Sequence, residues 1–317
     1  MSTFVIKRWR RSLLLPVAAL ALTACASEMP TDESDAADDG GSVEDADGSV
    51  ITVGSNDSAE GVLMANIYLG ALEAAGVEVD TQLNIGSREI YWPALEQGEI
   101  DLMPEYIGSL HNHLTGGDDT ITTTEDLLED LAEQVPDDIV FLDPAEAENP
   151  NAHLVTPETA DEYGLTTLSD LAEVSDELVA GGPPEARERP DGLPGLEEVY
   201  GIEFADYRDL DNGGPLTIEA LIGGDIDVAR AYATMGVIAD EGWINLEDDQ
   251  NLMNNENLTP AIRQEVLTDE VEAALNEVSA RLTTDELIAM NQRTEVENED
   301  PDMVAVEWLE EQGIGDE

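Results

Sequence analysis

An α/β fold with mostly parallel sheets flanked by helices is predicted by three observations. Short apolar strands alternate with amphipathic helices over the first part of the folded region. These elements follow one another as strand, helix, strand, helix and strand, the order that builds a mostly parallel sheet. The chain has 317 residues, enough for one large or two medium domains of this class with a substantial core.

The first three elements are recognised by their hydrophobic periodicity. Residues 50–53 form a short apolar run, which is typical of a buried strand. After the segment GSNDSAEG, apolar residues from Leu63 to Ala74 return at helical spacing and share one face. Residues 77–85 alternate between apolar and polar side chains, which predicts the second strand.

A second helix and a third strand complete this unit. Ser87 fits the N-cap of a helix that reaches Gln97, and Pro93 is expected to kink or restart it. Residues 100–103 form the next strand, and Tyr106 follows it. Ligands bind beyond the carboxyl ends of parallel strands, so we expect Tyr106 at a binding edge.

A similar segment recurs later in the chain. ALEQGEIDLM at 94–103 matches ALIGGDIDVA at 220–229, and each segment passes from a helix through glycine into a strand. Tyr232 follows the second strand at the distance at which Tyr106 follows the first. Either the two units are a repeat that directs two aromatic rings toward one cleft, or a common helix-to-strand junction has arisen twice by chance.

The charge of the chain excludes several classes of partner. Its 73 acidic and 12 basic residues give a formal net charge of −61, and Lys7 is its only lysine. So acidic a protein repels nucleic acid and anionic membrane. Because the acid is spread along the whole chain and salt screens its self-repulsion, the composition favours a protein adapted to high salt. An ordinary acidic secreted protein is the alternative.

Residues 1–24 have the pattern of a signal peptide. A basic segment at 7–11 precedes the apolar stretch 13–22, which is too short to span a bilayer as a stable anchor. The tetrapeptide that ends in Cys25, LTAC, resembles the lipobox of bacterial lipoproteins, which implies cleavage before Cys25 and a lipid on its sulfur. Cys25 is the only cysteine, so it forms no internal disulfide, and a free thiol is the alternative. Arg10 and Arg11 loosely resemble a twin-arginine signal, which leaves the export route open.

Residues 25–48 are expected to be a lipidated cysteine followed by an acidic disordered tether. They contain almost no large apolar side chains, so folding could not repay the loss of chain entropy. A lipid anchor and a tether would place the folded body at the extracellular face of the cell membrane, on the periplasmic side if an outer membrane is present. That arrangement suits capture and delivery of a solute.

Several blocks of the folded region together resemble one protein family. The blocks are VGSNDSAEGVLMANIY, IGSREIYWPALEQGEIDLMPEYIGSL, GGPPEARERPDGLPGLEEVYGIEF and DLDNGGPLTIEALIGGDIDVARAYAT. They are similar to the substrate-binding proteins of osmoprotectant ABC importers, which bind glycine betaine, choline and related quaternary amines. The resemblance implies a two-lobed type II periplasmic-binding-protein fold. Lobe I would comprise 49–150 plus 231–317, and lobe II would comprise 151–230.

The resemblance also implies a function and a set of site residues. A monomer would capture a quaternary amine in the cleft between the lobes and deliver it to the transmembrane permease, with no cofactor and no metal. Aromatic faces suit a trimethylammonium group, because it has no proton to donate in a hydrogen bond. The ligand-binding residues expected from the family are Tyr106, Tyr232, Ser109, Asn56, Asp57, Ser58, Asn151, Thr234 and Glu256.

The sequence departs from the family pattern at positions that face the solute in relatives. By alignment, Ala152 and Glu256 stand where betaine-binding members have cage aromatics, and Arg230 and Met235 stand where many members have aspartates. A glutamate could balance a cation by charge, but an unpaired buried carboxylate is costly. Another small zwitterion, such as an ergothioneine-like amino-acid derivative, is therefore an alternative solute.

Other functions have less support in the sequence. Arg88 could clamp a solute carboxylate or pair with an acid at the surface, and Tyr91 and Trp92 suit core packing. No nucleophile elbow, phosphate loop or Cys/His metal cluster occurs, so an enzyme is not expected. An extracellular hydrolase and an adhesive surface protein are the rival classes.

Overall fold

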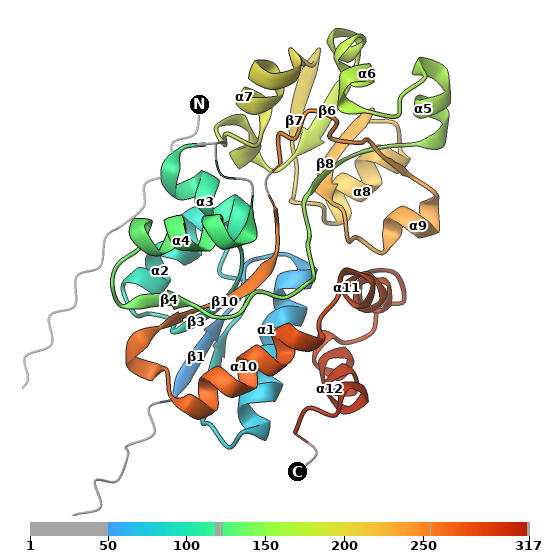
Figure 1. Cartoon of the computed structure of the whole chain (residues 1–317). Helices are drawn as coiled ribbons and strands as arrows, with labels where there is room; N and C mark the ends of the chain where they lie inside the picture. Colours follow the sequence, from blue (N-terminus) through green and yellow to red (C-terminus); the bar gives the residue numbers. More distant parts are fainter. Residues whose placement is uncertain (1–49, 118–120, 122, 254, 316–317) are drawn as a thin grey trace, which may run out of the picture. The chain divides into compact units, whose positions relative to one another are not determined.

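The computed structural model describes residues 50–117, 121, 123–253 and 255–315, and these residues build two five-stranded sheets flanked by helices (Figure 1). The expected signal peptide, Cys25 and the tether at 25–48 lie outside the described residues. No helix among the described residues is long and apolar enough to cross a membrane.

The first sheet has the strand order β2-β1-β3-β10-β4. Its strands β1, β2 and β3 are parallel to one another, and β10 runs antiparallel to both β3 and β4. The strands are β1 (Ile51–Gly54), β2 (Val79–Gln82), β3 (Leu102–Tyr106), β4 (Ile139–Phe141) and β10 (Leu258–Arg263). The helices that belong with this sheet are α1 (Ala59–Ala74), α2 (Arg88–Glu96), α3 (Ile107–Thr115), α4 (Thr124–Gln134), α10 (Asp269–Arg281), α11 (Thr284–Asn291) and α12 (Pro301–Gln312).

The second sheet repeats this topology with the order β7-β6-β8-β5-β9. Here β6, β7 and β8 are parallel, and β5 runs antiparallel to both β8 and β9. The strands are β5 (Asn151–Val155), β6 (Val179–Gly182), β7 (Asp206–Asp209), β8 (Val228–Tyr232) and β9 (Ile244–Asn245). The helices are α5 (Pro157–Tyr163), α6 (Leu168–Ala172), α7 (Leu193–Gly195), α8 (Pro215–Ile222) and α9 (Val237–Glu241), with the 3-10 turn η2 (Pro184–Arg187).

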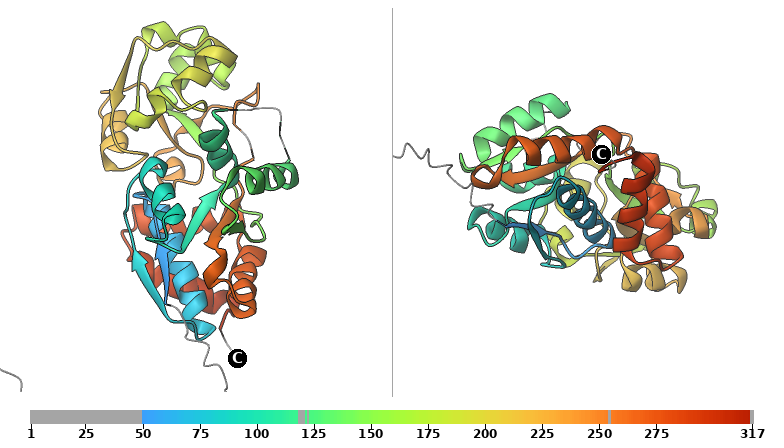
Figure 2. Two further views of the ribbon diagram at one scale, coloured as in Figure 1. Left: turned by 90° about the vertical axis from the view of Figure 1, so that its left-hand side faces the viewer. Right: turned by 90° about the horizontal axis from the view of Figure 1, so that it is seen from below.

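Each sheet has apolar clusters of its own. Helix α1 is buried along most of its length and packs against α10 and α12 (Figure 2). Its Leu63 and Ile67 are fully buried in the cluster that also holds Trp308 of α12. In the second sheet, Leu154 of β5 and Trp243 are buried together with residues of α8. Burial of this much apolar surface on each sheet stabilises the two units separately.

The chain passes between the two sheets twice. It leaves the first sheet after β4 and returns through β10, and the two crossing segments pair through an antiparallel bridge between Glu148 and Asn257. The Asn149 N–H also donates to the Glu256 carbonyl at 3.1 Å. This paired crossing fixes the position of Asn149 and Glu256 beside the junction of the two units.

The structure confirms the α/β class and most of the expected elements, with local corrections. Strand β2 is shorter at both ends than the alternating pattern suggested, and it stops before Asn84, which adopts a left-handed φ of 57°. Pro93 lies inside α2 and neither ends nor restarts it. Both sheets are mixed rather than mostly parallel, because each includes an antiparallel crossing strand.

The two repeat-like segments occupy equivalent places in the two sheets. Tyr106 and Tyr232 are the last residues of β3 and β8, and they pair with Leu258 and Asn151 of the antiparallel neighbours. The tyrosines therefore end their strands rather than following them, since pairing with the crossing strand extends each strand by several residues. The same topology around both strands favours a true repeat over a chance similarity.

The two sheets divide the chain at a different point from the expected lobe boundary. Residue 230 lies inside β8, and β9 still pairs with β5 of the second sheet. Leu246 and Leu252 are also buried in the cluster of the second sheet. The division into lobes stays a prediction, and the sheets place the return to lobe I after β9 rather than at 231.

Candidate functional site

A cleft of about 640 Å³ is lined by residues from the units of both sheets. It lies at the carboxyl ends of their parallel strands, where binding sites of such sheets form. The first unit contributes the loop after β1 and the start of α2. The second contributes the segment after β6, the loop before α8 and the end of β8. Polar and aromatic residues in this lining include Asn56, Glu60, Arg88, Tyr91, Asn149, Arg189, Tyr232, Thr234, Asn291 and Glu295.

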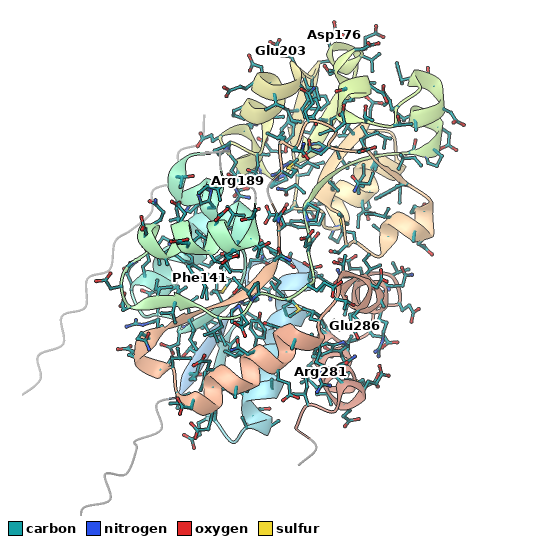
Figure 3. All side chains as sticks on the ribbon, viewed as in Figure 1. Phe141, Asp176, Arg189, Glu203, Arg281 and Glu286 are labelled. Carbon is teal, nitrogen blue, oxygen red and sulfur yellow. The ribbon has the colours of Figure 1, made fainter. Side chains whose placement is uncertain are left out.

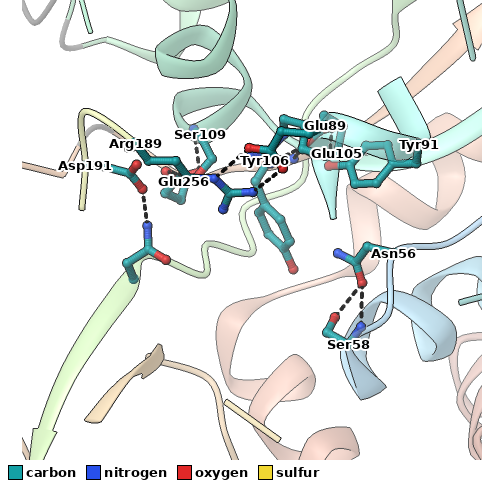
Figure 4. A network of polar contacts seen from close by, with 12 residues as sticks. Asn56, Ser58, Glu89, Tyr91, Glu105, Tyr106, Ser109, Arg189, Asp191 and Glu256 are labelled. Atoms are coloured by element: carbon teal, nitrogen blue, oxygen red, sulfur yellow. Dashed lines mark hydrogen bonds and ion pairs between the residues drawn. The ribbon is translucent and has the colours of Figure 1, made fainter. Parts of the chain in front are cut away.

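The loop after β1 lines the cleft as expected, but two of its side chains are used locally. Ser58 is the N-cap of α1, and its Oγ accepts a hydrogen bond from the Gly61 N–H at 3.0 Å. Asn56 Oδ1 accepts from the Ser58 N–H at 2.9 Å and from the Ser58 hydroxyl at 2.7 Å (Figure 4). Asp57 is exposed. The loop is thus held rigidly at the edge of the cleft.

The two tyrosines differ in their relation to the cleft. Tyr232 lines it, and its hydroxyl is hydrogen-bonded to the Asn212 amide. Tyr106 is not among the lining residues, and its hydroxyl donates to Glu60, which does line the cleft. Burial raises the pKa of both tyrosines, and for Tyr106 the neighbouring Glu60 carboxylate raises it further. Both rings are therefore neutral, half-buried aromatic surfaces close to the same carboxylate.

Glu60 connects several elements of the site. It lies in the first turn of α1 and is buried, and its carboxylate accepts four side-chain hydrogen bonds. The Asn149 and Asn291 amides each donate at 2.6 Å, the Thr234 hydroxyl donates at 2.5 Å, and the Tyr106 hydroxyl is the fourth donor. Thr234 comes from the segment after β8, so this carboxylate joins the two units.

Ser109 and Glu256 bind each other beside Tyr106. The Glu256 carboxylate accepts from the Ser109 N–H at 3.0 Å and from the Ser109 hydroxyl at 2.7 Å (Figure 4). Glu256 is buried, and burial raises its pKa to about 8, although the bonds from Ser109 and the charge of Arg88 oppose that shift. Neither residue is among those that line the cleft.

Both arginines of the cleft are paired with carboxylates. Arg88 is buried and donates to Glu105 at 2.6 Å, and the Tyr91 hydroxyl donates to the same carboxylate at 2.7 Å. This pair is buried, not at the surface. Arg189 of the second unit, labelled in Figure 3, donates two hydrogen bonds, of 3.0 and 3.1 Å, to Glu89 at the start of α2 (Figure 4). It is the only ion pair between the two units among the described residues.

Asn151 lies behind the cleft in a buried polar cluster. Its amide donates to Asp191 at 2.7 Å, and Arg230 donates to the same carboxylate oxygen at 2.9 Å. Ala152 packs on the opposite face of β5, in the apolar cluster that includes Ala231. The position expected from alignment to hold a cage residue therefore faces the core.

The structure brings together five of the nine predicted ligand residues, namely Asn56, Asp57, Ser58, Tyr232 and Thr234. The other four, Tyr106, Ser109, Asn151 and Glu256, are not among the lining residues; Tyr106 is bonded to the lining residue Glu60, and the side chains of the other three are bonded to residues outside the lining or to each other. The sequence did not reveal Glu60, because an acid in the first turn of a helix is expected for the helix dipole alone. No local sequence pattern indicated a role for Arg189 or Asn291, because their hydrogen-bond partners lie about 100 and 230 residues away in the chain.

Two sheets of matching topology with a polar cleft at their strand ends define a solute-binding protein of the type II periplasmic fold. The comparisons agree. A family model described as the substrate-binding domain of an ABC-type glycine betaine transport system matches residues 49–311. The chain belongs to this family and is the substrate-binding protein of an ABC transport system.

Named relatives from two bacteria and one crystal structure are similar to this chain over most of its length. The glycine betaine-binding protein YehZ of Escherichia coli is 28% identical over 278 residues, which cover 84% of this chain and 91% of that protein. The carnitine transport binding protein OpuCC of Listeria monocytogenes is 27% identical over 280 residues, which cover 86% of this chain and 88% of that protein. A crystal structure titled as a glycine betaine/carnitine/choline ABC transporter matches with a TM-score of 0.66 and 25% identity, covering 84% of this chain and 99% of that one.

Proposed function

We propose that this protein captures a quaternary amine osmoprotectant of the glycine betaine, choline or carnitine class in its cleft and delivers it to a membrane permease. The observation that carries the proposal is the place of Tyr232, a neutral aromatic ring that lines the cleft close to the Glu60 carboxylate. A trimethylammonium group binds the negative face of such a ring and is balanced by nearby carboxylates. The named relatives bind solutes of this chemistry.

Solute binding is proposed to favour closure of the two lobes. Arg189 with Glu89, and Thr234 with Glu60, form bonds between the two units that exist only when the units are close. A solute that contacts both units stabilises this arrangement by its differential affinity for the closed form. The permease would then recognise the closed form of a monomer.

The cellular setting is also a proposal. A signal peptide followed by lipidation of Cys25 would anchor the protein at the extracellular face of the cell membrane. The acidic tether at 25–48 would let the folded body reorient between capture and delivery. The net charge of −61 supports adaptation to high salt.

Thermal unfolding with and without solutes tests the proposal. A solute that binds only the folded form raises the unfolding midpoint, and more so at higher concentration. We expect glycine betaine, choline or carnitine at millimolar concentration to raise the midpoint in wild type and to have little effect on Tyr232→Ala. A folded protein that none of these solutes stabilises would contradict the proposal.

Ergothioneine, the alternative solute, is tested in the same thermal unfolding experiment. The Helicobacter pylori protein named as an ergothioneine transport permease and binding protein is 24% identical over 272 residues, which cover 48% of that protein. Stabilisation by ergothioneine alone would keep the transport function and change the solute.

A further inference from the structure

Two exposed apolar side chains accompany the cleft, one in each unit. Ile90 in the first turn of α2 is 58% exposed, and Leu216 in the first turn of α8 is 59% exposed. The two helices belong to different units (Figure 1). Within two residues of each side chain are residues that line the cleft, namely Arg88, Tyr91, Pro215 and Ile218. Both units therefore place an uncovered apolar side chain next to the cleft lining.

The two positions are equivalent in the repeat. The match between 94–103 and 220–229, extended toward the N-terminus without a gap, pairs Ile90 with Leu216. It also pairs lining residues of the cleft with each other, Ser87 with Gly213 and Arg88 with Gly214. Helix α2 lies between β2 and β3, and α8 lies between β7 and β8, which have the same places in the two sheets. A single exposed apolar residue is ordinary, but its recurrence at the equivalent position indicates a shared use.

Both side chains are presented by well-supported helix ends. The N–H of Leu216 donates to the Asp211 carboxylate at 2.9 Å, which holds the first turn of α8. Ile90 is followed by Tyr91, which is buried and whose hydroxyl is bonded to Glu105. A contact surface that is already ordered loses little conformational entropy when a partner binds. The two side chains are therefore suited to a protein contact.

The separation of the two side chains depends on the closure of the lobes. Ile90 moves with the first unit and Leu216 with the second, so any movement of one unit relative to the other changes the distance between them. Arg189 of the second unit is bonded to Glu89, the residue before Ile90, and this bond helps to fix that distance in the closed form. A partner that contacts both side chains at once binds the closed form better than the open one.

The charges of the two helices define the chemistry of that partner. Exposed carboxylates lie on both helices, at Glu89, Glu96 and Glu219. The only basic residue of the two helices, Arg88, is buried and bonded to Glu105. A complementary surface is therefore apolar at two points and basic around them. A second copy of this chain and an anionic lipid surface would each bring charges of the same sign.

We propose that Ile90 and Leu216 are the two apolar contacts through which the closed protein docks on its permease, one on each of two equivalent membrane subunits. Two equivalent contacts fit a partner that presents the same pocket twice, as a two-fold symmetric dimer does. This inference rests on the proposed function, since it names the surface that delivers the solute. It is separate from solute binding, because neither side chain is among the residues that line the cleft.

Uptake of labelled solute by the cells that naturally make this protein tests the inference, with the substituted gene in place of the natural one. The label is choline, glycine betaine or carnitine, whichever the purified wild type binds. Ile90→Asp and Leu216→Asp are each expected to reduce uptake at least about fivefold, while the purified variants keep the wild-type solute affinity within about twofold. Aspartate is favourable in the first turn of a helix, so both variants should fold. Leu216→Met keeps an apolar side chain and should retain uptake within about twofold.

Met303→Asp is the matched control. Met303 is 59% exposed in the first turn of α12, a helix that contributes no residue to the cleft lining. This variant adds the same charge at the same kind of position and is expected to keep wild-type uptake.

The outcomes separate the docking surface from the proposed function. Wild-type uptake in both Ile90→Asp and Leu216→Asp overturns the docking surface and leaves solute binding in place. An equal loss in Met303→Asp does the same, and so does a loss of solute affinity that matches the loss of uptake. A wild-type dimer in sedimentation that Leu216→Asp dissociates also overturns it, because the partner would be a second copy. If folded wild type binds none of the three solutes, the proposed function fails and the docking surface fails with it.

Discussion

Replacement of Glu256 by glutamine is expected to stabilise the protein, and to do so more at high pH. Burial raises the pKa of this carboxyl from its ordinary value of 4.5 to about 8 in the folded chain. The folded state therefore binds more protons than the unfolded state between these two values. Stability must then fall as pH rises through that interval.

The magnitude follows from the two pKa values. At pH 7 the folded side chain is mostly protonated and the unfolded one is ionised, which costs the wild type about 3 kcal/mol of unfolding free energy. The cost rises to about 5 kcal/mol near pH 9 and is under about 1 kcal/mol near pH 5. Glutamine has no charge to lose and keeps both contacts, since its oxygen can accept from the Ser109 N–H and its amide can donate to the hydroxyl.

Urea unfolding followed by tryptophan fluorescence measures this effect. The unfolding free energies of wild type and Glu256→Gln are compared near pH 5, 7 and 9 at constant high salt, with Glu297→Gln as the control for the loss of one exposed charge. The difference between wild type and Glu256→Gln is expected to grow with pH. Parallel pH profiles for the two proteins would show that Glu256 is not buried and uncompensated as described.

Three further predictions concern the cleft and the surface. Tyr232→Ala should weaken binding of a trimethylammonium solute by about tenfold in calorimetry, whereas Tyr232→Phe should stay within about threefold, because the ring face carries the interaction. Equal losses in both would point to the hydroxyl. Glu60→Gln places an NH2 group against one amide and one hydroxyl of its four donors; the hydroxyl can turn to accept, but the buried amide loses its acceptor and the other bonds lose the charge of theirs. The unfolding free energy should fall by about 3 kcal/mol, and an unchanged thermal midpoint would contradict the connecting role of Glu60. Raising NaCl from about 0.1 to about 1 M should raise the thermal midpoint, because the Debye length falls from about 10 to about 3 Å; a midpoint that does not rise would argue against salt adaptation.

Much of the fold could be predicted because it depends on local patterns. Strand β1, helix α1 and the glycine junctions before β3 and β8 follow from hydrophobic periodicity and turn chemistry alone. The predicted strand ends were wrong where segments that are distant in the sequence pair with one another. Tyr106 and Tyr232 belong to their strands because the crossing strands β10 and β5 pair with them, and neither partner is near in sequence.

Less of the binding site could be predicted from the sequence, for the same reason. The similarity to relatives located Tyr232 and Thr234 in the cleft lining, but it could not show that Ser109 is already bound by Glu256. Nor could any local pattern show that one carboxylate, Glu60, collects donors from four separate parts of the chain. Such bonds exist only after distant segments of the chain have folded together, and the bond from Thr234 also needs the two units to be close.

Equilibrium dialysis of labelled choline against the folded protein in molar salt tests the central claim most directly. The account predicts saturable binding at one site per chain, competed by excess glycine betaine or carnitine and weakened at least about fivefold by Tyr232→Ala. Failure of choline, glycine betaine and carnitine all to occupy a site on folded protein would contradict it. So would binding that Tyr232→Ala leaves unchanged, because the solute would then lie outside the cleft described.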